Sequence, residues 1–162
     1  MTVTGLPEPW TVRFSKSKSR QYFFNSVTKQ SQWEEPEGTD HAALKQHLTN
    51  HPLRVRCLHL LIKHKDSKRP ASHRCDPITL SKDEALEELS VYQRKIEQGE
   101  KFEELAKFRS DCSSFKRGGD LGYFASGEMQ PPFEKAAFAL KVGQVSGPVE
   151  TASGVHIIKR VT

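Results

Sequence analysis

The sequence predicts an α+β protein: a small three-stranded antiparallel module, a partly helical linker, and a domain with a four-stranded sheet surrounded by helices. The first observation is a pair of tryptophans, Trp10 and Trp33, which bracket short strand-like runs. The second is a later hydrophobic run with period-two alternation, followed by segments of helical periodicity. With 162 residues available, we expect the module at 5–37, the linker at 38–52 and the domain at 53–162.

The composition is that of a charged globular protein, with 35% hydrophobic residues, 28% charged residues and a formal net charge of +5. No run of about 18 apolar residues occurs and no signal-peptide pattern opens the chain, so we expect a soluble protein retained inside the cell. Cys57, Cys75 and Cys112 form no Cys-x-x-Cys pair, which favours free thiols. The positive charge favours acidic partners, and phosphopeptides, nucleic acid and anionic surfaces all fit it.

The small module is expected to depend on large aromatic side chains, because about thirty residues bury little core. Its predicted strands are Thr11–Ser15, Gln21–Asn25 and Ser31–Glu34. One side is expected to be closed by Leu6, Pro7, Trp10 and Pro36. Tyr22 and Trp33 then remain available on the opposite side.

The linker is expected to contain a short helix. Asp40 is a suitable N-cap, and Leu44 and Leu48 share one face with His47 beside them. The segment Asn50-His51-Pro52 ends this helix, because proline disfavours a helical conformation in the residue before it. The linker is therefore expected to be an ordered spacer.

The first strand of the larger domain is expected at about residues 53–64 and changes character along its length. Alternation places Val55, Cys57, His59 and Leu61 on one face. Cations then crowd the strand end and the loop that follows: Lys63, Lys65, Lys68 and Arg69. A polar imidazole on a core face beside unpaired cations predicts a small pocket for an anionic ligand.

Three helices and three further strands complete the predicted domain. Ser81 and Glu84 form a capping box for a long helix that ends before Gly99. The expected buried positions of the three helices are Ala85, Leu89, Tyr92 and Ile96; Phe102, Leu105 and Ala106; and, after Pro131-Pro132, Phe133, Ala136, Ala137 and Leu140. The strands are expected near Tyr123–Ala125, Gly147–Glu150 and Val155–Val161.

Residues 6–36 resemble a WW domain on the two tryptophans and the proline that follows the second. The resemblance implies that Tyr22 and Trp33 form the groove that receives polyproline-type segments. The first loop is rich in serine and lysine, and its Ser15 and Lys16 stand where phosphate-reading WW domains hold a phosphoryl group.

Residues 53–162 resemble the parvulin family of peptidyl-prolyl cis/trans isomerases. The resemblance rests on the inward histidine His59, on the Gly-Gly-Asp-Leu-Gly run that follows Cys112, on Gly127-Glu-Met-Gln-Pro-Pro-Phe133 and on the segment around His156. With the WW module and the cationic loop, the whole chain resembles the parvulins directed to phosphoSer-Pro and phosphoThr-Pro, in their fungal branch. No cofactor and no metal ion is implied.

The resemblance assigns roles to three groups of residues. The apolar cup for the proline ring is Leu121, Met129 and Phe133, and the anchor for the phosphate is Lys63, Lys68 and Arg69. The polar floor beneath the turning amide is Cys112, His59 and His156, with Thr151 and Ser153 completing the network and Gln130 contacting substrate backbone. The family often has two arginines where this chain has Lys68-Arg69, and lysine keeps the charge but loses the bidentate fork.

The chemistry requires no covalent step. Rotation about a peptide bond faces a barrier of about 18–20 kcal/mol, so the site has to favour the twisted amide over both planar forms. Whether Cys112 acts as a thiolate, an electrostatic element or a packing residue stays open. His59 and His156 favour a structural network that fixes each other's tautomers, and a direct catalytic role is compatible with it.

Four other functions fit parts of the sequence. A Cys112–His156 hydrolase leaves the cationic loop unexplained, and a metal site from Cys57-x-His59 and His73-x-Cys75 has unusual zinc spacing. A nucleic-acid binder is disfavoured because the cations gather beside a proline-sized cup. A phosphoSer/Thr-Pro adaptor with little turnover is the hardest to separate from an isomerase.

Partners and location follow only from the resemblance. They are phosphoSer/Thr-Pro proteins of transcription regulation and the cell cycle, above all the carboxy-terminal tail of the large RNA polymerase II subunit. Nucleic acid and membranes are not expected partners, and the chain is expected to be a monomer. The expected location is the nucleus, with the cytoplasm as a second compartment.

Overall fold

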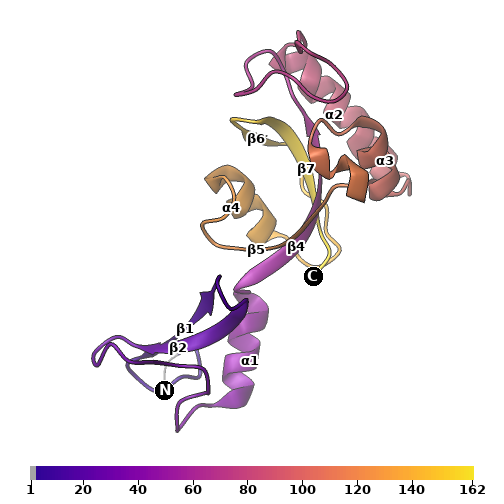
Figure 1. Ribbon diagram of the computed structural model, residues 1–162. Helices are drawn as coiled ribbons and strands as arrows, with labels where there is room; N and C mark the ends of the chain where they lie inside the picture. Colours follow the sequence, from indigo (N-terminus) through magenta and orange to yellow (C-terminus); the bar gives the residue numbers. More distant parts are fainter. Residues whose placement is uncertain (1–2) are drawn as a thin grey trace. The chain divides into compact units, whose positions relative to one another are not determined.

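The computed structural model describes residues 3–162, which form two compact units. The first unit ends at Arg54 and the second spans Val55–Thr162 (Figure 1). Over the described residues, no helix combines the length and the apolar character needed to cross a membrane.

The first unit contains an antiparallel sheet of three strands in the order β1-β2-β3. The strands are β1 (Trp10–Ser15), β2 (Arg20–Asn25) and β3 (Ser31–Gln32). β3 is shorter than the predicted Ser31–Glu34, because only Phe23↔Gln32 and Phe24↔Ser31 pair with β2. The β2–β3 turn is closed by Asn25, whose side-chain oxygen accepts the backbone N–H groups of two turn residues.

Helix α1 (His41–Asn50) belongs to the core of this first unit. Asp40 caps it by accepting the N–H of Ala43 at 3.1 Å. Leu44 is buried against Leu6 and Phe23, and Trp10, Val12 and Leu48 pack around them. The segment expected to be only an ordered spacer therefore supplies part of the hydrophobic cluster that the small sheet alone lacks.

The second unit contains a four-stranded sheet with the order β5-β4-β7-β6. The strands are β4 (Arg54–Ile62), β5 (Asp120–Ala125), β6 (Val149–Thr151) and β7 (Gly154–Arg160). β4 is central, and its residues from Cys57 to Ile62 are all buried. A central strand with both faces covered is typical of a sheet between two helical layers.

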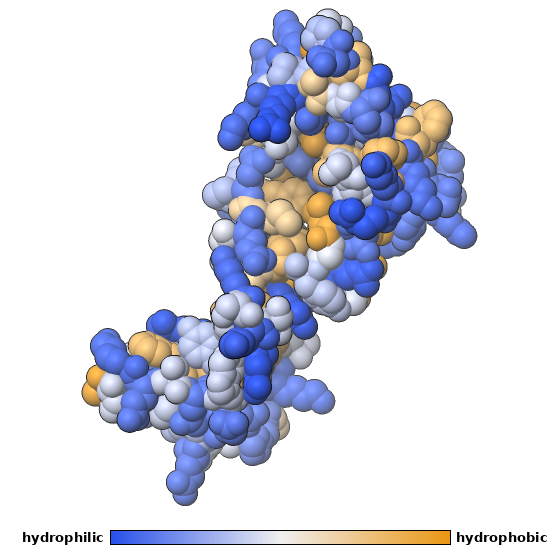
Figure 2. Space-filling model, in the orientation of Figure 1, coloured by the Kyte–Doolittle hydropathy of each residue, from blue (hydrophilic) through white to orange (hydrophobic). Residues whose placement is uncertain are grey.

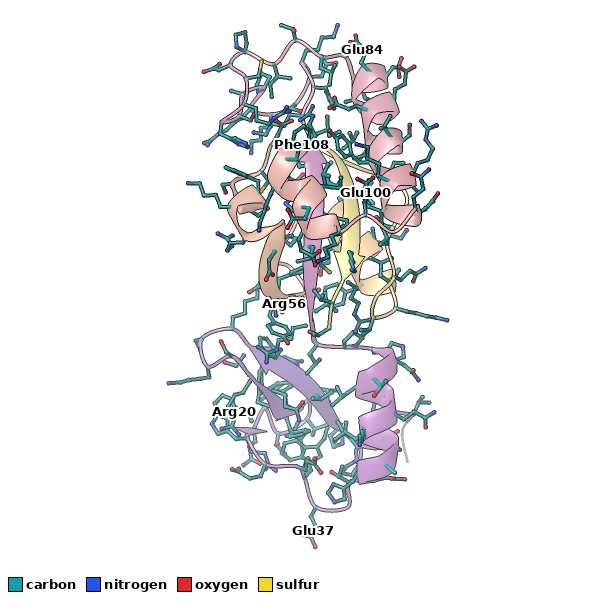
Figure 3. The ribbon with its side chains drawn as sticks, turned by 90° about the vertical axis from the view of Figure 1, so that its right-hand side faces the viewer. Arg20, Glu37, Arg56, Glu84, Glu100 and Phe108 are labelled. Atoms are coloured by element: carbon teal, nitrogen blue, oxygen red, sulfur yellow. The ribbon has the colours of Figure 1, made fainter. Side chains whose placement is uncertain are left out.

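Helices cover both faces of this sheet (Figure 1). On one face α2 (Lys82–Glu97) and α3 (Phe102–Arg109) enclose a cluster that includes Leu60, Leu89 and Ile157. On the other face α4 (Pro131–Ala139) encloses a second cluster built around Phe124, Phe133 and Ile158. Figure 3 labels Glu84 near the start of α2, Glu100 beyond its end and Phe108 on α3.

The predicted start of α2 is confirmed in part. The hydroxyl of Ser81 accepts the N–H of Glu84 at 3.1 Å, which satisfies one of the orphan donors of the first turn. The helix then buries Ala85, Leu89 and Tyr92.

Several strand ends differ from the prediction. β4 stops at Ile62 because the N–H of Lys63 donates to the carboxylate of Asp111 instead of to a neighbouring strand. β6 runs on to Thr151, which pairs with Gly154 across a two-residue turn. β5 begins three residues early, at Asp120. Two glycines separate it from a 3₁₀ helix, η1 (Ser113–Arg117), that the sequence did not predict.

Candidate active site

Two histidines from neighbouring strands form the centre of the site. His59 on β4 is paired with Ile158, and His156 on β7 is paired with Leu61, so the histidines are diagonal neighbours on one face. Both are buried, at 5% and 4% exposure. Their Nδ1 atoms lie 3.0 Å apart and their rings stack with centroids 5.2 Å apart. The predicted convergence of these two residues is present.

The histidine pair is connected to the β6–β7 turn. Nε2 of His156 lies 2.7 Å from the hydroxyl oxygen of Thr151, which also accepts the N–H of Ser153 at 3.1 Å. One of the two Nδ1 atoms has to donate to the other, so the proton positions of both rings are correlated. The contact with Thr151 extends this coupled network to the hydroxyl, which donates to Nε2 of His156 in one tautomer and accepts from it in the other.

Burial and mutual repulsion keep His156 uncharged. Burial, and then the charge of His59, lower the pKa of His156 to about 3. His156 is therefore neutral over the physiological pH range, and it serves as a neutral hydrogen-bonding partner.

Cys112 has a thiol that ionises easily. Burial raises its pKa, but the proximity of His59, with a smaller contribution from Ser114, outweighs burial and brings the pKa to about 6. His59 acts on the thiol by its proximity and not through a hydrogen bond, because Nε2 of His59 is buried without a hydrogen-bond partner among residues 3–162. By contrast, burial raises the pKa of Cys57 to about 11. The two thiols therefore differ in chemistry within the same domain.

The three residues predicted to hold a proline ring lie together beside this network. Phe133 is buried on α4, and Leu121 and Met129 pack against the same cluster while remaining partly exposed. The ring of Phe133 meets His59 and His156 edge-on, with centroids 5.5 Å and 5.2 Å away. Figure 2 shows apolar atoms in a recess of this unit within a largely hydrophilic surface.

The cationic loop lies on another side of the site. A cavity of about 460 Å³ is lined by Lys63 of this loop, by Cys112 and by Ser153 among others. Nζ of Lys63 donates to a loop carbonyl at 2.8 Å. The side chains of Lys68 and Arg69 are exposed and form no ion pair within the described part of the chain. They are therefore available to an anion.

Gln130 connects the start of α4 to the β6–β7 turn. Its amide nitrogen donates to the hydroxyl of Ser153 at 2.8 Å, and its amide oxygen accepts the N–H of Ala152 at 3.1 Å. The carbonyl of Ala152 in turn accepts the N–H of Lys68 at 2.8 Å. The turn thus joins the apolar cup to the cationic loop, and both polar ends of the Gln130 side chain are already occupied.

Asp111 is a supporting residue that the sequence prediction missed. It is buried, accepts the N–H of Lys63 at 2.9 Å and the hydroxyl of Ser72 at 2.7 Å, and pairs with Arg109 at 3.0 Å. Arg109 also pairs with Glu88 of α2. No sequence signal pointed to Asp111, because its contacts with Lys63 and Ser72 join residues that lie 48 and 39 positions apart.

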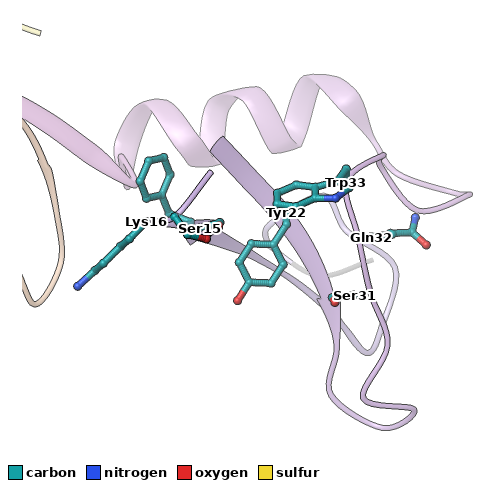
Figure 4. Close-up of a pocket in the computed structure, with 8 residues that line it drawn as sticks. Ser15, Lys16, Tyr22, Ser31, Gln32 and Trp33 are labelled. Atoms are coloured by element: carbon teal, nitrogen blue, oxygen red, sulfur yellow. Dashed lines mark hydrogen bonds between the residues drawn. The ribbon is translucent and has the colours of Figure 1, made fainter. Parts of the chain in front are cut away.

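The first unit has its own candidate groove, lined by the four residues predicted for it (Figure 4). Ser15, Lys16, Tyr22 and Trp33 border a cavity of about 550 Å³. Tyr22 and Trp33 meet edge-on with ring centroids 6.1 Å apart. The guanidinium of Arg20 lies over the Trp33 ring at 4.7 Å, a cation–π contact that the prediction did not include.

Comparisons with known proteins agree with this architecture. The model of the PPIC-type PPIASE domain matches residues 59–162, and that of the WW domain matches residues 6–36. The chain is 66% identical over 161 residues to the peptidyl-prolyl cis-trans isomerase ESS1 of Saccharomyces cerevisiae, covering 98% of this chain and 95% of the relative. It is 47% identical over 173 residues to the isomerase pin1 of Schizosaccharomyces pombe, covering 99% of each.

A solved structure extends the similarity to three dimensions. The peptidyl-prolyl isomerase ESS1 from Candida albicans superposes with a TM-score of 0.68 at 44% identity, covering 100% of this chain and 99% of that one. The predicted fold class, a WW sheet followed by a parvulin-type domain, is confirmed. The chain therefore belongs to the parvulin (PPIC-type) family of peptidyl-prolyl cis-trans isomerases and carries a WW domain in addition to the isomerase domain.

Proposed function

We propose that this isomerase acts on phosphoSer-Pro and phosphoThr-Pro bonds in phosphoproteins, without a covalent intermediate. The observation that carries the proposal is the position of the cations. Lys68 and Arg69 are exposed without ion-pair partners in the described chain, and Lys63 of the same loop lines the cavity that also contains Cys112. A phosphate on the residue before proline matches this charge, and Arg69 offers a bidentate contact to it.

In the proposed mechanism, the site holds the substrate on both sides of the peptide bond while the carbonyl between them turns. Phe133, Leu121 and Met129 hold the proline ring, and the cationic loop holds the phosphate. The carbonyl then turns above Cys112 and His59. The planar amide is stabilised by a resonance form with negative charge on oxygen, and a thiolate near that oxygen disfavours it.

The other residues predicted for the site support this geometry. His156 and Thr151 fix the tautomer of His59, and Ser153 holds the turn that contains Thr151. For Gln130 we propose a contact to substrate backbone that exchanges with its present bonds to Ser153 and Ala152. Removing the thiolate with only a small loss of volume, by Cys112→Ser, is then expected to slow turnover while substrate binding is retained.

NMR exchange spectroscopy on a phosphoSer-Pro peptide tests the activity. Accelerated cis/trans exchange is expected, because lowering the barrier by about 5 kcal/mol speeds exchange several thousandfold. Binding without acceleration would contradict the proposal and leave a phosphopeptide adaptor as the function. Equal acceleration of the phosphorylated and unphosphorylated peptides would remove the phosphate role from the loop.

Arg69→Ala tests the loop directly. Turnover of the phosphopeptide is expected to fall by about tenfold or more, since a charge-assisted contact is worth about 1.5–3 kcal/mol, while a Glu-Pro peptide loses less. Lys65→Ala is the matched control, because Lys65 is an exposed cation of the same loop without an assigned role. Equal losses on both peptides would mean that Arg69 has a structural role only.

For the WW unit we propose binding of phosphoSer/Thr-Pro segments through Ser15, Lys16, Tyr22 and Trp33, supported by the groove that these residues border. The proposed partners are transcription and cell-cycle phosphoproteins, foremost the repeated Ser-Pro tail of the large RNA polymerase II subunit, and the proposed location is the nucleus. A phosphorylated tail peptide is expected to bind and its unphosphorylated form to bind weakly. Equal affinities by calorimetry would contradict this.

A further inference from the structure

We propose that His73 is a positioning residue for phosphate recognition: its ring, stacked on Phe115, holds the cationic loop against the segment that contains Cys112. The two rings are nearly parallel, with centroids 3.8 Å apart and an interplanar angle of 10°. The inference deepens the proposed function above and rests on it.

The loop reaches the site through three consecutive residues, each of which has a different partner. The carbonyl of Ala71 accepts Nζ of Lys63 at 2.8 Å, and the hydroxyl of Ser72 donates to Asp111 at 2.7 Å. His73 follows and stacks on Phe115. The first two contacts are single hydrogen bonds between partly buried groups, whereas the third is a broad contact between two flat rings.

Phe115 is itself tied closely to Cys112. It is the third residue of η1, and its N–H donates to the carbonyl of Cys112 at 3.0 Å. The carbonyl of Phe115 accepts the N–H of Gly118 at 3.0 Å, which closes the turn on the other side. A displacement of Phe115 would therefore displace Cys112, and the stack fixes the loop with respect to the catalytic thiol.

This matters because the loop between β4 and α2 forms no helix or strand of its own. The separation between Lys68 or Arg69 and the histidine floor therefore depends on individual contacts: the hydrogen bond from the N–H of Lys68 to the carbonyl of Ala152, and the stack of His73 on Phe115. If the loop opens, a bound phosphate is held farther from the floor and the amide no longer reaches the turning position. An unphosphorylated peptide does not depend on this separation.

The test compares a phosphoSer-Pro and an Ala-Pro peptide in the full chain. His73→Ala is expected to lower kcat/KM for the phosphopeptide about three- to tenfold, mostly through KM, because a stacked ring pair contributes an effect of that size. Ala-Pro turnover is expected to stay within about twofold of the starting protein. His73→Phe, which keeps the stack, is expected to restore phosphopeptide turnover.

Phe115→Ala provides the second arm. It is expected to lower phosphopeptide turnover as much as His73→Ala does, and the double variant is expected to lose no more than either single variant. His51→Ala is the matched control, because His51 is also a histidine with its ring stacked on another ring, that of His47, but it belongs to the first unit.

Three outcomes overturn the inference: no rescue by His73→Phe, additive losses in the double variant, or an equal loss on Ala-Pro. The result for the starting protein separates this inference from the proposed function. If the unsubstituted protein shows no preference for phosphate, the proposed function fails. If it shows that preference and His73→Ala keeps it, only the role of His73 fails.

Discussion

At the scale of single residues, Cys112 and Cys57 have opposite ionisation behaviour. The pKa of Cys112 is about 6 and that of Cys57 is about 11. In a Cys75→Ser background we expect alkylation of Cys112 by iodoacetamide to rise with pH and reach half its maximum rate near pH 6, as followed by peptide mass spectrometry. Cys57 is expected to stay unlabelled at neutral pH.

The control for this prediction is His59→Gln, which removes the group that lowers the pKa. The midpoint for Cys112 is then expected to move upward, toward the ordinary thiol value. Because the folded pKa lies below the ordinary value, the thiolate contributes stability at alkaline pH that is lost as pH falls through about 6. A Cys112 midpoint near pH 9 in the unsubstituted protein would contradict the assignment.

His156 gives a second prediction at this scale. Its folded pKa of about 3 lies below the ordinary value of 6.5, so the unfolded chain binds more protons between these values. The stability from neutral His156 is complete above pH 6.5 and is lost as pH falls toward 3. In ¹⁵N NMR spectra the ring of His156 is expected to stay neutral down to about pH 4, and titration near pH 6.5 would exclude the assigned environment.

The sequence was sufficient to predict the histidine pair but not the residues that support the rest of the site. Strand periodicity of two placed His59 and His156 on inward faces, and the family's motif order supplied their neighbours. Asp111 and the His73–Phe115 stack lie in segments without periodicity, so no sequence pattern links them. Their partners are set by the tertiary structure.

At the scale of elements, Gly119 allows β5 to begin next to β4. It has φ +85°, its carbonyl accepts the N–H of His59 at 2.9 Å, and a Cβ there would lie 2.3 Å from the carbonyl oxygen of His59. Gly119→Ala is expected to lower the free energy of unfolding by about 3 kcal/mol or more, measured by urea denaturation, since strain and steric clash add.

Gly143→Ala is the matched control for this prediction. Gly143 has φ +84°, almost the same as Gly119, but a Cβ there would meet nothing within 4 Å. Its replacement is expected to cost only the backbone strain, about 1–2 kcal/mol. Equal losses for the two variants would show that the approach of Gly119 to His59 has no energetic weight.

Element boundaries followed the sequence where a local signal existed. Asp40 and Ser81 were recognised as helix caps because capping is a contact between residues close in sequence. The end of β4 was predicted two residues too late, because it depends on Asp111, 48 positions farther along the chain. The helix η1 was missed because its short turn has no apolar period.

At the scale of the whole molecule, the two units are connected by a very short segment. α1 ends at Asn50 and is packed into the first unit, whereas β4 begins at Arg54. The segment between the end of α1 and the start of β4 is therefore much shorter than residues 38–52, the range predicted for the linker. A short connection gives a high effective concentration of one binding site near the other, of order millimolar when the geometry permits.

We therefore expect a peptide with two phosphoSer-Pro sites to bind at least about tenfold more tightly than a peptide with one, provided its spacer reaches both units. Trp33→Ala, which removes the ligand-facing ring of the WW groove, is expected to abolish this gain while leaving turnover of a single-site peptide unchanged. Calorimetry with a series of spacer lengths measures the effect. If affinity doubles only statistically at every spacer length, the two units bind their peptides independently, and the short connection then serves only to hold the units on one chain.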